Sequence, residues 1–153
     1  MAAVREAKAI WNGDLMKGTG AVTAVSSGRF DALPVSWAAR TEAPGGKTSP
    51  EELLAAAHAS CFAMALSAGL GRAGTPATRL EVAAKVTFDK VGNDWTVVSS
   101  DLTVDGTVPG IDEETFAKAA DGAKEGCPIS RALKGNVKLS VRAALAEHAE
   151  ART

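Results

Sequence analysis

Alternating apolar and polar positions predict short strands along much of the chain. Segments of this kind are separated by turn residues such as Gly, Asn, Asp and Ser. The predicted strands are residues 4–11, 20–25, 29–40, 79–90, 95–106 and 136–144. Most of them follow one another as hairpins, with Gly92-Asn93-Asp94 supplying one turn. We therefore expect a largely antiparallel sheet.

A long apolar stretch predicts a central helix from Ser49 to about Leu70. Ser49 is a good N-cap, Pro50 suits the first helical position, and Glu52 completes a capping box. The stretch is apolar nearly all round, which predicts a buried helix. Because its apolar part, Leu53 to Leu70, opens directly after Glu51 and Glu52 and contains His58, we expect a core helix and no membrane span.

Two shorter helices are predicted after the fifth strand. Asp112 caps a helix over residues 113–125, and Cys127-Pro128 begins a third helix that ends at Gly135. The element order is then βββ-α-ββ-αα-β, an α+β fold.

Composition limits the class of protein. The chain has 153 residues, a net charge of −1 and no Tyr. We expect a single domain over residues 1–153 with a loose tail at 148–153. The balanced charge predicts no nucleic-acid partner. The N-terminal segment lacks the pattern of a signal peptide, so we expect a cytoplasmic protein.

Two cysteines, Cys61 and Cys127, are the main candidates for chemistry. They are 66 positions apart, too far for a local CxxC or metal motif. Cys127 lies at a helix N-terminus, whose partial positive charge stabilises a thiolate. Cys61 lies inside an apolar helix, where burial raises a thiol pKa. The residues alone favour Cys127 as the more reactive thiol, and two unreactive buried thiols also fit the pattern.

Activation of Cys61 requires a cation or a hydrogen-bond donor. His58 lies three residues earlier on the same helix face, and it fits either a Cys–His pair or a satisfied core histidine. Arg40, predicted at a strand end, can pair with Glu51, although both also fit ordinary surface positions. Glu51 and Cys61 are ten residues apart, about 15 Å along a helix. If both serve one site, Glu51 comes from a second subunit, which predicts a homodimer.

Three segments resemble the OsmC/Ohr family of osmotically inducible and organic hydroperoxide resistance proteins. The run SPEELLAAAHASCFAMALS resembles the family signature, and VPGIDEETFAKAADGAKEGCPISRAL resembles its second cysteine region. The opening AKAIWNGDLMKGTGAV favours the OsmC branch. The resemblance covers almost the whole chain.

The resemblance implies an intertwined homodimer in which sheets from both chains wrap around central helices. It also implies a peroxidase that uses thiols and no metal, haem or flavin cofactor. Cys61 is then the attacking residue, Cys127 the resolving residue, and Arg40 with Glu51 the activating pair. The loop after Arg40 is longer than usual in the family, which leaves Arg29 as a second candidate.

The implied reaction reduces organic hydroperoxides and, more weakly, hydrogen peroxide. The Cys61 thiolate attacks the peroxide and becomes a sulfenic acid, with which Cys127 forms a disulfide. A dithiol reductant, for which the family suggests a dihydrolipoyl protein, then reduces the disulfide. Two alternatives remain open from the residues: a Cys–His hydrolase or acyl transferase using His58, and a non-catalytic, stress-related binding domain.

Overall fold

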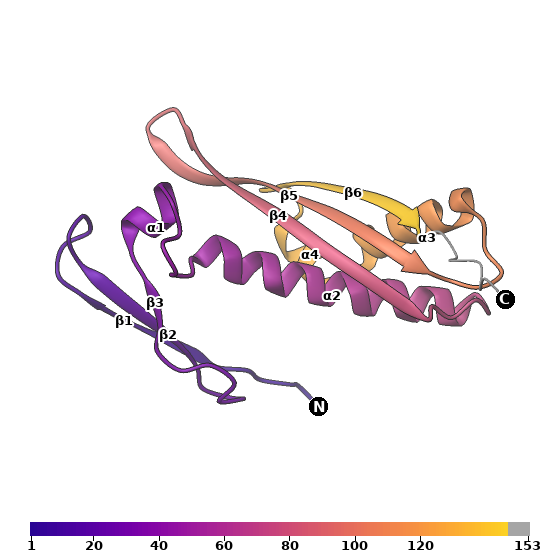
Figure 1. Ribbon diagram of the computed structural model, residues 1–153, viewed down its shortest axis with the longest axis horizontal. Coiled ribbons are helices and arrows are strands. Elements are labelled where there is room, and N and C mark those ends of the chain that lie inside the picture. Colours follow the sequence, from indigo (N-terminus) through magenta and orange to yellow (C-terminus); the bar gives the residue numbers. More distant parts are fainter. Residues whose placement is uncertain (147–153) are drawn as a thin grey trace, which may run out of the picture. The chain divides into compact units, whose positions relative to one another are not determined.

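The computed structural model describes residues 1–146, which fall into two compact units (Figure 1). The first unit is Met1–Leu53, and the second begins at Leu54. The tail at residues 148–153, expected to be loose, lies outside the described residues.

The first unit contains a three-stranded antiparallel sheet followed by a short helix. The elements are β1 (Ala7–Asn12), β2 (Thr19–Ala24), β3 (Leu33–Val35) and α1 (Trp37–Thr41), and the strands lie in the order β1-β2-β3. The predicted strand over residues 29–40 is correct only for Leu33–Val35, and it is wrong before Leu33 and beyond Val35. Ser36 has an extended backbone, and its hydroxyl accepts a hydrogen bond from the Ala39 amide at 3.1 Å. This cap begins α1, so Arg40 lies on a helix and not at a strand end.

The long helix α2 (Pro50–Arg72) begins as the sequence predicts. The Ser49 hydroxyl accepts a hydrogen bond from the Glu52 amide at 3.1 Å, which confirms the N-cap. The Glu52 carboxylate accepts a hydrogen bond from the Thr48 hydroxyl at 2.7 Å and so ties the preceding loop to the first turn.

The second unit is built on a sheet in the order β4-β5-β6. Its further elements are β4 (Arg79–Val91), β5 (Asp94–Thr107), α3 (Glu113–Gly126), α4 (Pro128–Leu133) and β6 (Lys138–Leu145). β4 and β5 form the predicted antiparallel hairpin. β5 and β6, however, are parallel, because the chain crosses back through α3 and α4 before it pairs again. The fold is the predicted α+β type, with this one parallel pair in an otherwise antiparallel arrangement.

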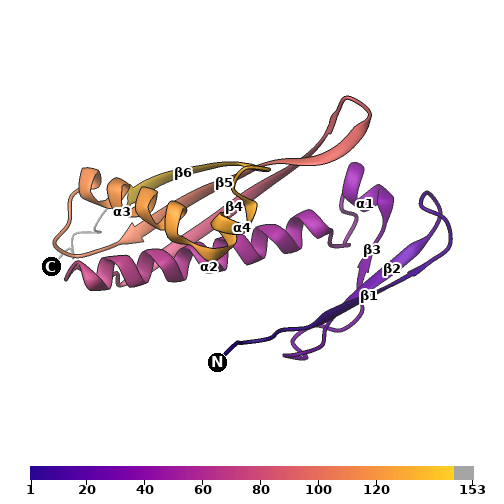
Figure 2. The ribbon, with the colours of Figure 1, turned by 180° about the vertical axis from the view of Figure 1, so that it is seen from behind.

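The core of the second unit lies between its sheet and its helices. Figures 1 and 2 show α2, α3 and α4 beside the β4-β5-β6 sheet. The buried cluster draws residues from α2, β5, the loop directly after β5, α3 and the α3–α4 junction: Phe62, Leu66, Leu70, Leu102, Val104, Val108, Phe116, Ala120, Ala123 and Cys127. One continuous core thus holds the junction before α4 against α2.

Only one face of α2 is buried in the single chain. His58, Phe62, Leu66 and Leu70, spaced four residues apart, face the core, whereas Met64 is 68% exposed. The prediction of burial nearly all round is therefore wrong for one chain. By length and composition α2 could cross a membrane, and 22% of its apolar window is buried.

Candidate active site

The two cysteines, distant in sequence, meet in the second unit. Cys61 projects from the middle of α2 and is half-buried, whereas Cys127 caps α4 and is completely buried. Their thiols interact directly, and each changes the pKa of the other. Of the two cysteines, Cys61 is therefore the more exposed.

The α4 N-terminus favours the thiolate form of Cys127. Burial raises the pKa of this thiol, but the Ser130 amide, the Cys61 thiol, the Ser130 hydroxyl and the Ile129 amide outweigh burial and lower it. Pro128 occupies the first helical position, and these amide groups act on the sulfur in place of a regular cap hydrogen bond. The sequence-based expectation of a lowered pKa for Cys127 is borne out.

Cys61 has the opposite electrostatics. Burial and the hydrogen bond with Cys127 raise the pKa of its thiol, and the Ile129 amide offsets this only in part. No cation in residues 1–146 is among the causes of this shift. Within the second unit, Cys61 is thus the more accessible thiol but the less activated one.

Arg40 and Glu51 form a close ion pair in the first unit. Arg40 donates from Nε to both carboxylate oxygens of Glu51, at 3.0 and 3.1 Å, and from Nη2 to Oε1 at 2.8 Å. Glu51 is only 8% exposed, and the Arg40 guanidinium also lies 5.9 Å from the centre of the Trp37 ring. The bidentate pairing fixes the guanidinium in one pose. The predicted partnership of these two residues is therefore present.

An apolar pocket of about 300 Å³ adjoins Arg40. Its walls come from β1, the loop after it, β3, α1 and the start of α2: Trp11, Leu15, Val35, Ser36, Trp37, Arg40 and Pro50. A cation at the edge of an apolar pocket suits a ligand with a polar end and a hydrocarbon tail.

His58 is completely buried and is held by two serines that sequence reasoning did not single out. Its Nδ1 lies 2.7 Å from Ser100 Oγ and its Nε2 lies 2.8 Å from Ser130 Oγ. Both ring nitrogens are therefore occupied, and none is left for a Cys–His pair with Cys61. The only sequence signal for Ser130 is its position three residues after the cap, Cys127.

Within residues 1–146, no cluster of His, Cys, Asp and Glu side chains could hold a metal ion. The polar side chains around the two thiols are serines and a histidine that bond to one another.

Comparison with known proteins gives the family. Residues 43–142 match the family model described as "OsmC-like protein". The chain is 41% identical to "Peroxiredoxin OsmC" of Escherichia coli (strain K12) over 135 residues, which cover 88% of this chain and 93% of that one. The chain belongs to the OsmC family. The predicted family is thereby confirmed, and the match includes Glu51, Cys61 and Cys127, whereas Arg40 precedes it.

Ohr proteins are also similar to this OsmC-family chain. It is 30% identical to "Organic hydroperoxide resistance protein" of Xanthomonas axonopodis pv. citri (strain 306) over 102 residues, 65% of this chain and 68% of that one. The crystal structure of the organic hydroperoxide resistance protein OhrB of Bacillus subtilis matches with a TM-score of 0.73 and 25% identity. It covers 91% of this chain and 98% of that one. The higher identity to OsmC agrees with the branch that the opening segment favours.

Proposed function

We propose that this protein is a thiol peroxidase that reduces organic hydroperoxides and, more weakly, hydrogen peroxide. The observation that carries the proposal is an accessible Cys61 in contact with a buried Cys127 of lowered pKa. Relatives named peroxiredoxin and organic hydroperoxide resistance protein support the same reaction class.

The reaction begins at Cys61 because peroxide can reach only an exposed sulfur. The Cys61 thiolate attacks the distal peroxide oxygen, the O–O bond breaks, and the alkoxide leaves as an alcohol after taking a proton. The sulfur loses two electrons and becomes a sulfenic acid. Cys127 then forms an S–S bond with Cys61 as the sulfenic hydroxyl leaves as water.

Arg40 and Glu51 of a second chain are the proposed activators of Cys61. Glu51 and Cys61 lie on one continuous helix, about 15 Å apart along its axis. A guanidinium held by Glu51 therefore acts on the partner's thiolate in a symmetric homodimer. There it lowers the thiol pKa and stabilises negative charge on the peroxide oxygens. The exposed apolar face of α2, where Met64 is 68% exposed, is the surface that a second chain would cover.

The pocket beside Arg40 supports an organic substrate. Its aromatic and aliphatic walls favour a hydrocarbon tail, while the guanidinium binds the peroxide end. Hydrogen peroxide lacks the tail and gains nothing from these walls, so it is the weaker substrate.

A dithiol reductant completes the cycle by exchange with the Cys61–Cys127 disulfide. A dihydrolipoyl protein is the candidate, because its two thiols can open the disulfide and close into a ring. Such reductants, and two reduced cysteines, are compatible with a cytoplasmic protein.

The test is oxidation of the fully reduced protein by cumene hydroperoxide and by hydrogen peroxide, followed by mass analysis. We expect a Cys61–Cys127 disulfide that forms faster with the organic peroxide and does not form in Cys61→Ser. A folded, reduced protein that forms no disulfide with either peroxide would contradict the proposal and favour a non-catalytic binding domain.

A further inference from the structure

The proposed reaction leaves one buried titratable group without a role. His58 is completely buried in the core of the second unit and bridges Ser100 on β5 and Ser130 on α4. Ser130, which is also buried, acts on the Cys127 sulfur through both its amide and its hydroxyl. The four side chains thus form one continuous series that ends at Cys127.

The number of protons on these four side chains decides which group donates and which accepts in each of their hydrogen bonds. Burial lowers the pKa of His58, so its ring is neutral and carries a single N–H. The Ser130 hydroxyl has one proton, and it can donate that proton to the Cys127 thiolate only if it accepts its other hydrogen bond. It then accepts from His58 Nε2–H, and the bare Nδ1 of His58 accepts from the Ser100 hydroxyl.

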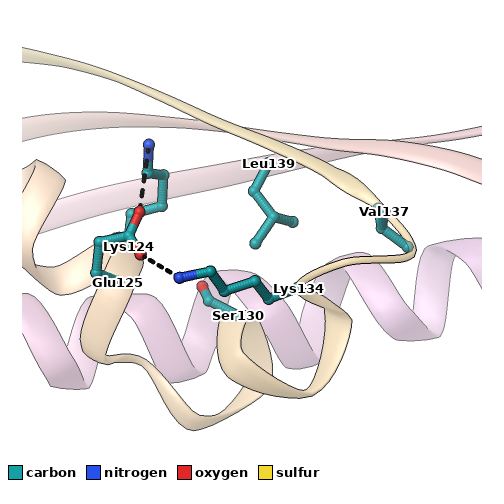
Figure 3. A pocket seen from close by; sticks show the side chains of 6 residues that line it. All are labelled: Lys124, Glu125, Ser130, Lys134, Val137 and Leu139. Carbon is teal, nitrogen blue, oxygen red and sulfur yellow. Dashed lines mark hydrogen bonds and ion pairs between the residues drawn. The ribbon is translucent and has the colours of Figure 1, made fainter.

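Among the described residues, no charged side chain on the neighbouring elements takes over the role of these hydrogen bonds at Cys127. Ser130 lies on the wall of a pocket of about 170 Å³ between α3, α4 and β6 (Figure 3). The charged side chains there are Lys124, Glu125 and Lys134, and both lysines pair with Glu125, at 4.0 and 3.1 Å. On α2 the titratable groups beside the series are His58 and Cys61, and β5 contributes the uncharged Ser100.

We propose that His58 is a positioning residue that orients the Ser130 hydroxyl as a hydrogen-bond donor to Cys127 and so favours the Cys127 thiolate that resolves the oxidised Cys61. The inference rests on the proposed function for its place in the cycle. The Cys127 thiolate attacks the sulfenic sulfur of Cys61, the S–S bond forms and the S–O bond breaks. The hydroxide that leaves takes a proton from solvent and becomes water.

The first test is the tautomer of His58, read from nitrogen-15 shifts of the imidazole. The sequence has two histidines, so His148→Gln assigns the remaining signal to His58. We expect a neutral ring protonated at Nε2 and bare at Nδ1 while Cys127 is a thiolate. A ring protonated mainly at Nδ1 would overturn the proposal, because Ser130 would then have to donate to His58 and not to Cys127.

The second test follows the thiolate of Cys127 by ultraviolet titration in a Cys61→Ser background. His58→Leu is expected to raise the midpoint by about one unit, a tenfold loss of thiolate below the midpoint. His58→Gln, which keeps an N–H donor for Ser130, is expected to retain most of the shift. Ser100→Ala removes only the hydrogen bond at His58 Nδ1, the ring nitrogen away from Ser130, and is expected to raise the midpoint less. Ser99→Ala, its neighbour on β5, is the matched control and leaves the midpoint unchanged.

An unchanged midpoint in folded Ser130→Ala and Ser100→Ala would overturn the proposal even if His58→Leu does not fold. In the cycle itself, His58→Leu is expected to slow disulfide formation about tenfold but not to slow Cys61 oxidation, because a less ionised Cys127 raises the pKa of Cys61 less. The tautomer and the titration need no peroxide. Suppose the protein has the expected tautomer and titration but is not oxidised by peroxide. This result would refute the proposed peroxidase function and leave the role of His58 standing.

Discussion

At the residue scale, the two thiols differ in what stabilises their thiolate forms. Cys127 receives its stabilisation from α4 and Ser130, close to it in the chain. Among the described residues of its unit, no cation stabilises the Cys61 thiolate, and burial and the neighbouring thiol raise its pKa. In the proposed mechanism its reactivity depends on Arg40 of a second chain, and Glu51 holds this arginine by three hydrogen bonds.

Removal of the guanidinium should slow the first step of the cycle. Arg40→Ala is expected to reduce the rate of Cys61 oxidation by cumene hydroperoxide about 10²-fold, the usual cost of losing one electrostatic donor. Stopped-flow oxidation of the reduced protein measures this rate. Arg29→Ala, which removes an exposed arginine of the same unit, is the matched control and should react like wild type. A larger loss in Arg29→Ala than in Arg40→Ala would reassign the activating cation.

The sequence could supply the four proposed site residues but not their surroundings. Cys127 followed by Pro128 is a local signal for the start of a helix, and in the structure Cys127 is the N-cap of α4. The serines around His58 lie 42 and 72 positions away along the chain, and no local pattern connects them. Contacts of this kind depend on the packing of α2 against β5 and α4, which the sequence does not reveal by spacing.

At the element scale, helix starts were predictable where a capping side chain stands next to an apolar run. Ser49 and Asp112 are such caps, and both accept the expected amide hydrogen bond. α1 was missed because its five residues are too few to show a helical period, and Ser36 was its only signal. The parallel pairing of β5 and β6 was missed because it depends on the path of the crossover and not on either strand.

The cap of α3 makes stability depend on pH. Hydrogen bonds from Thr115 to Asp112 lower the pKa of this carboxyl, so it is more acidic in the folded chain than in the unfolded chain. Its contribution is complete above the unfolded pKa, near 3.8, and is lost as pH falls through the folded value. Asp112→Ala should therefore unfold at lower urea than wild type at neutral pH, and this difference should shrink in acid.

Asp112→Asn is the control for the cap, because its side chain still accepts the amide hydrogen bond but does not titrate. It should unfold close to wild type at neutral pH. A difference between wild type and Asp112→Ala that stays constant from neutral to acid pH would contradict a titrating cap.

Close packing of α3 on β5 gives a second prediction about elements. A Cβ on Gly106 would overlap the buried ring of Phe116, so the strand approaches the helix only because this residue is glycine. Gly106→Ala should destabilise the fold by about 1–3 kcal/mol through overpacking. Urea unfolding at one fixed protein concentration measures the loss. Gly122→Ala on α3 meets open space and should not destabilise. Equal losses in both variants would contradict the packing argument.

At the scale of the whole molecule, each unit exposes large apolar side chains that a single chain leaves uncovered. Ile10 is 58% exposed, Trp11 42% and Met64 68%. Scattered apolar side chains are common on protein surfaces, but α2 is an apolar helix with only one buried face, which is the arrangement that the proposed second chain requires. The proposed homodimer would cover this face and bring Arg40 of one chain to Cys61 of the other.

Hybrid dimers test whether the site is shared between chains. Neither Arg40→Ala nor Cys61→Ser alone has a complete site, but a dimer of one chain of each kind would have one. Random mixing makes about half of the dimers hybrid, with one of two sites complete, so we expect roughly a quarter of wild-type activity. Co-expression with different tags provides the mixture. Activity no higher than that of the separate variants would place Arg40 and Cys61 of one site in the same chain.

The central claim is that peroxide reacts first at Cys61, and trapping of the sulfenic acid tests it most directly. Reduced Cys127→Ser and Cys61→Ser proteins are treated with cumene hydroperoxide and dimedone, and the adducts are located by peptide mass analysis. We predict an adduct on Cys61 in Cys127→Ser and no adduct on Cys127 in Cys61→Ser. An adduct on Cys127 in Cys61→Ser, with none on Cys61 in the other variant, would contradict the account and make Cys127 the attacking thiol.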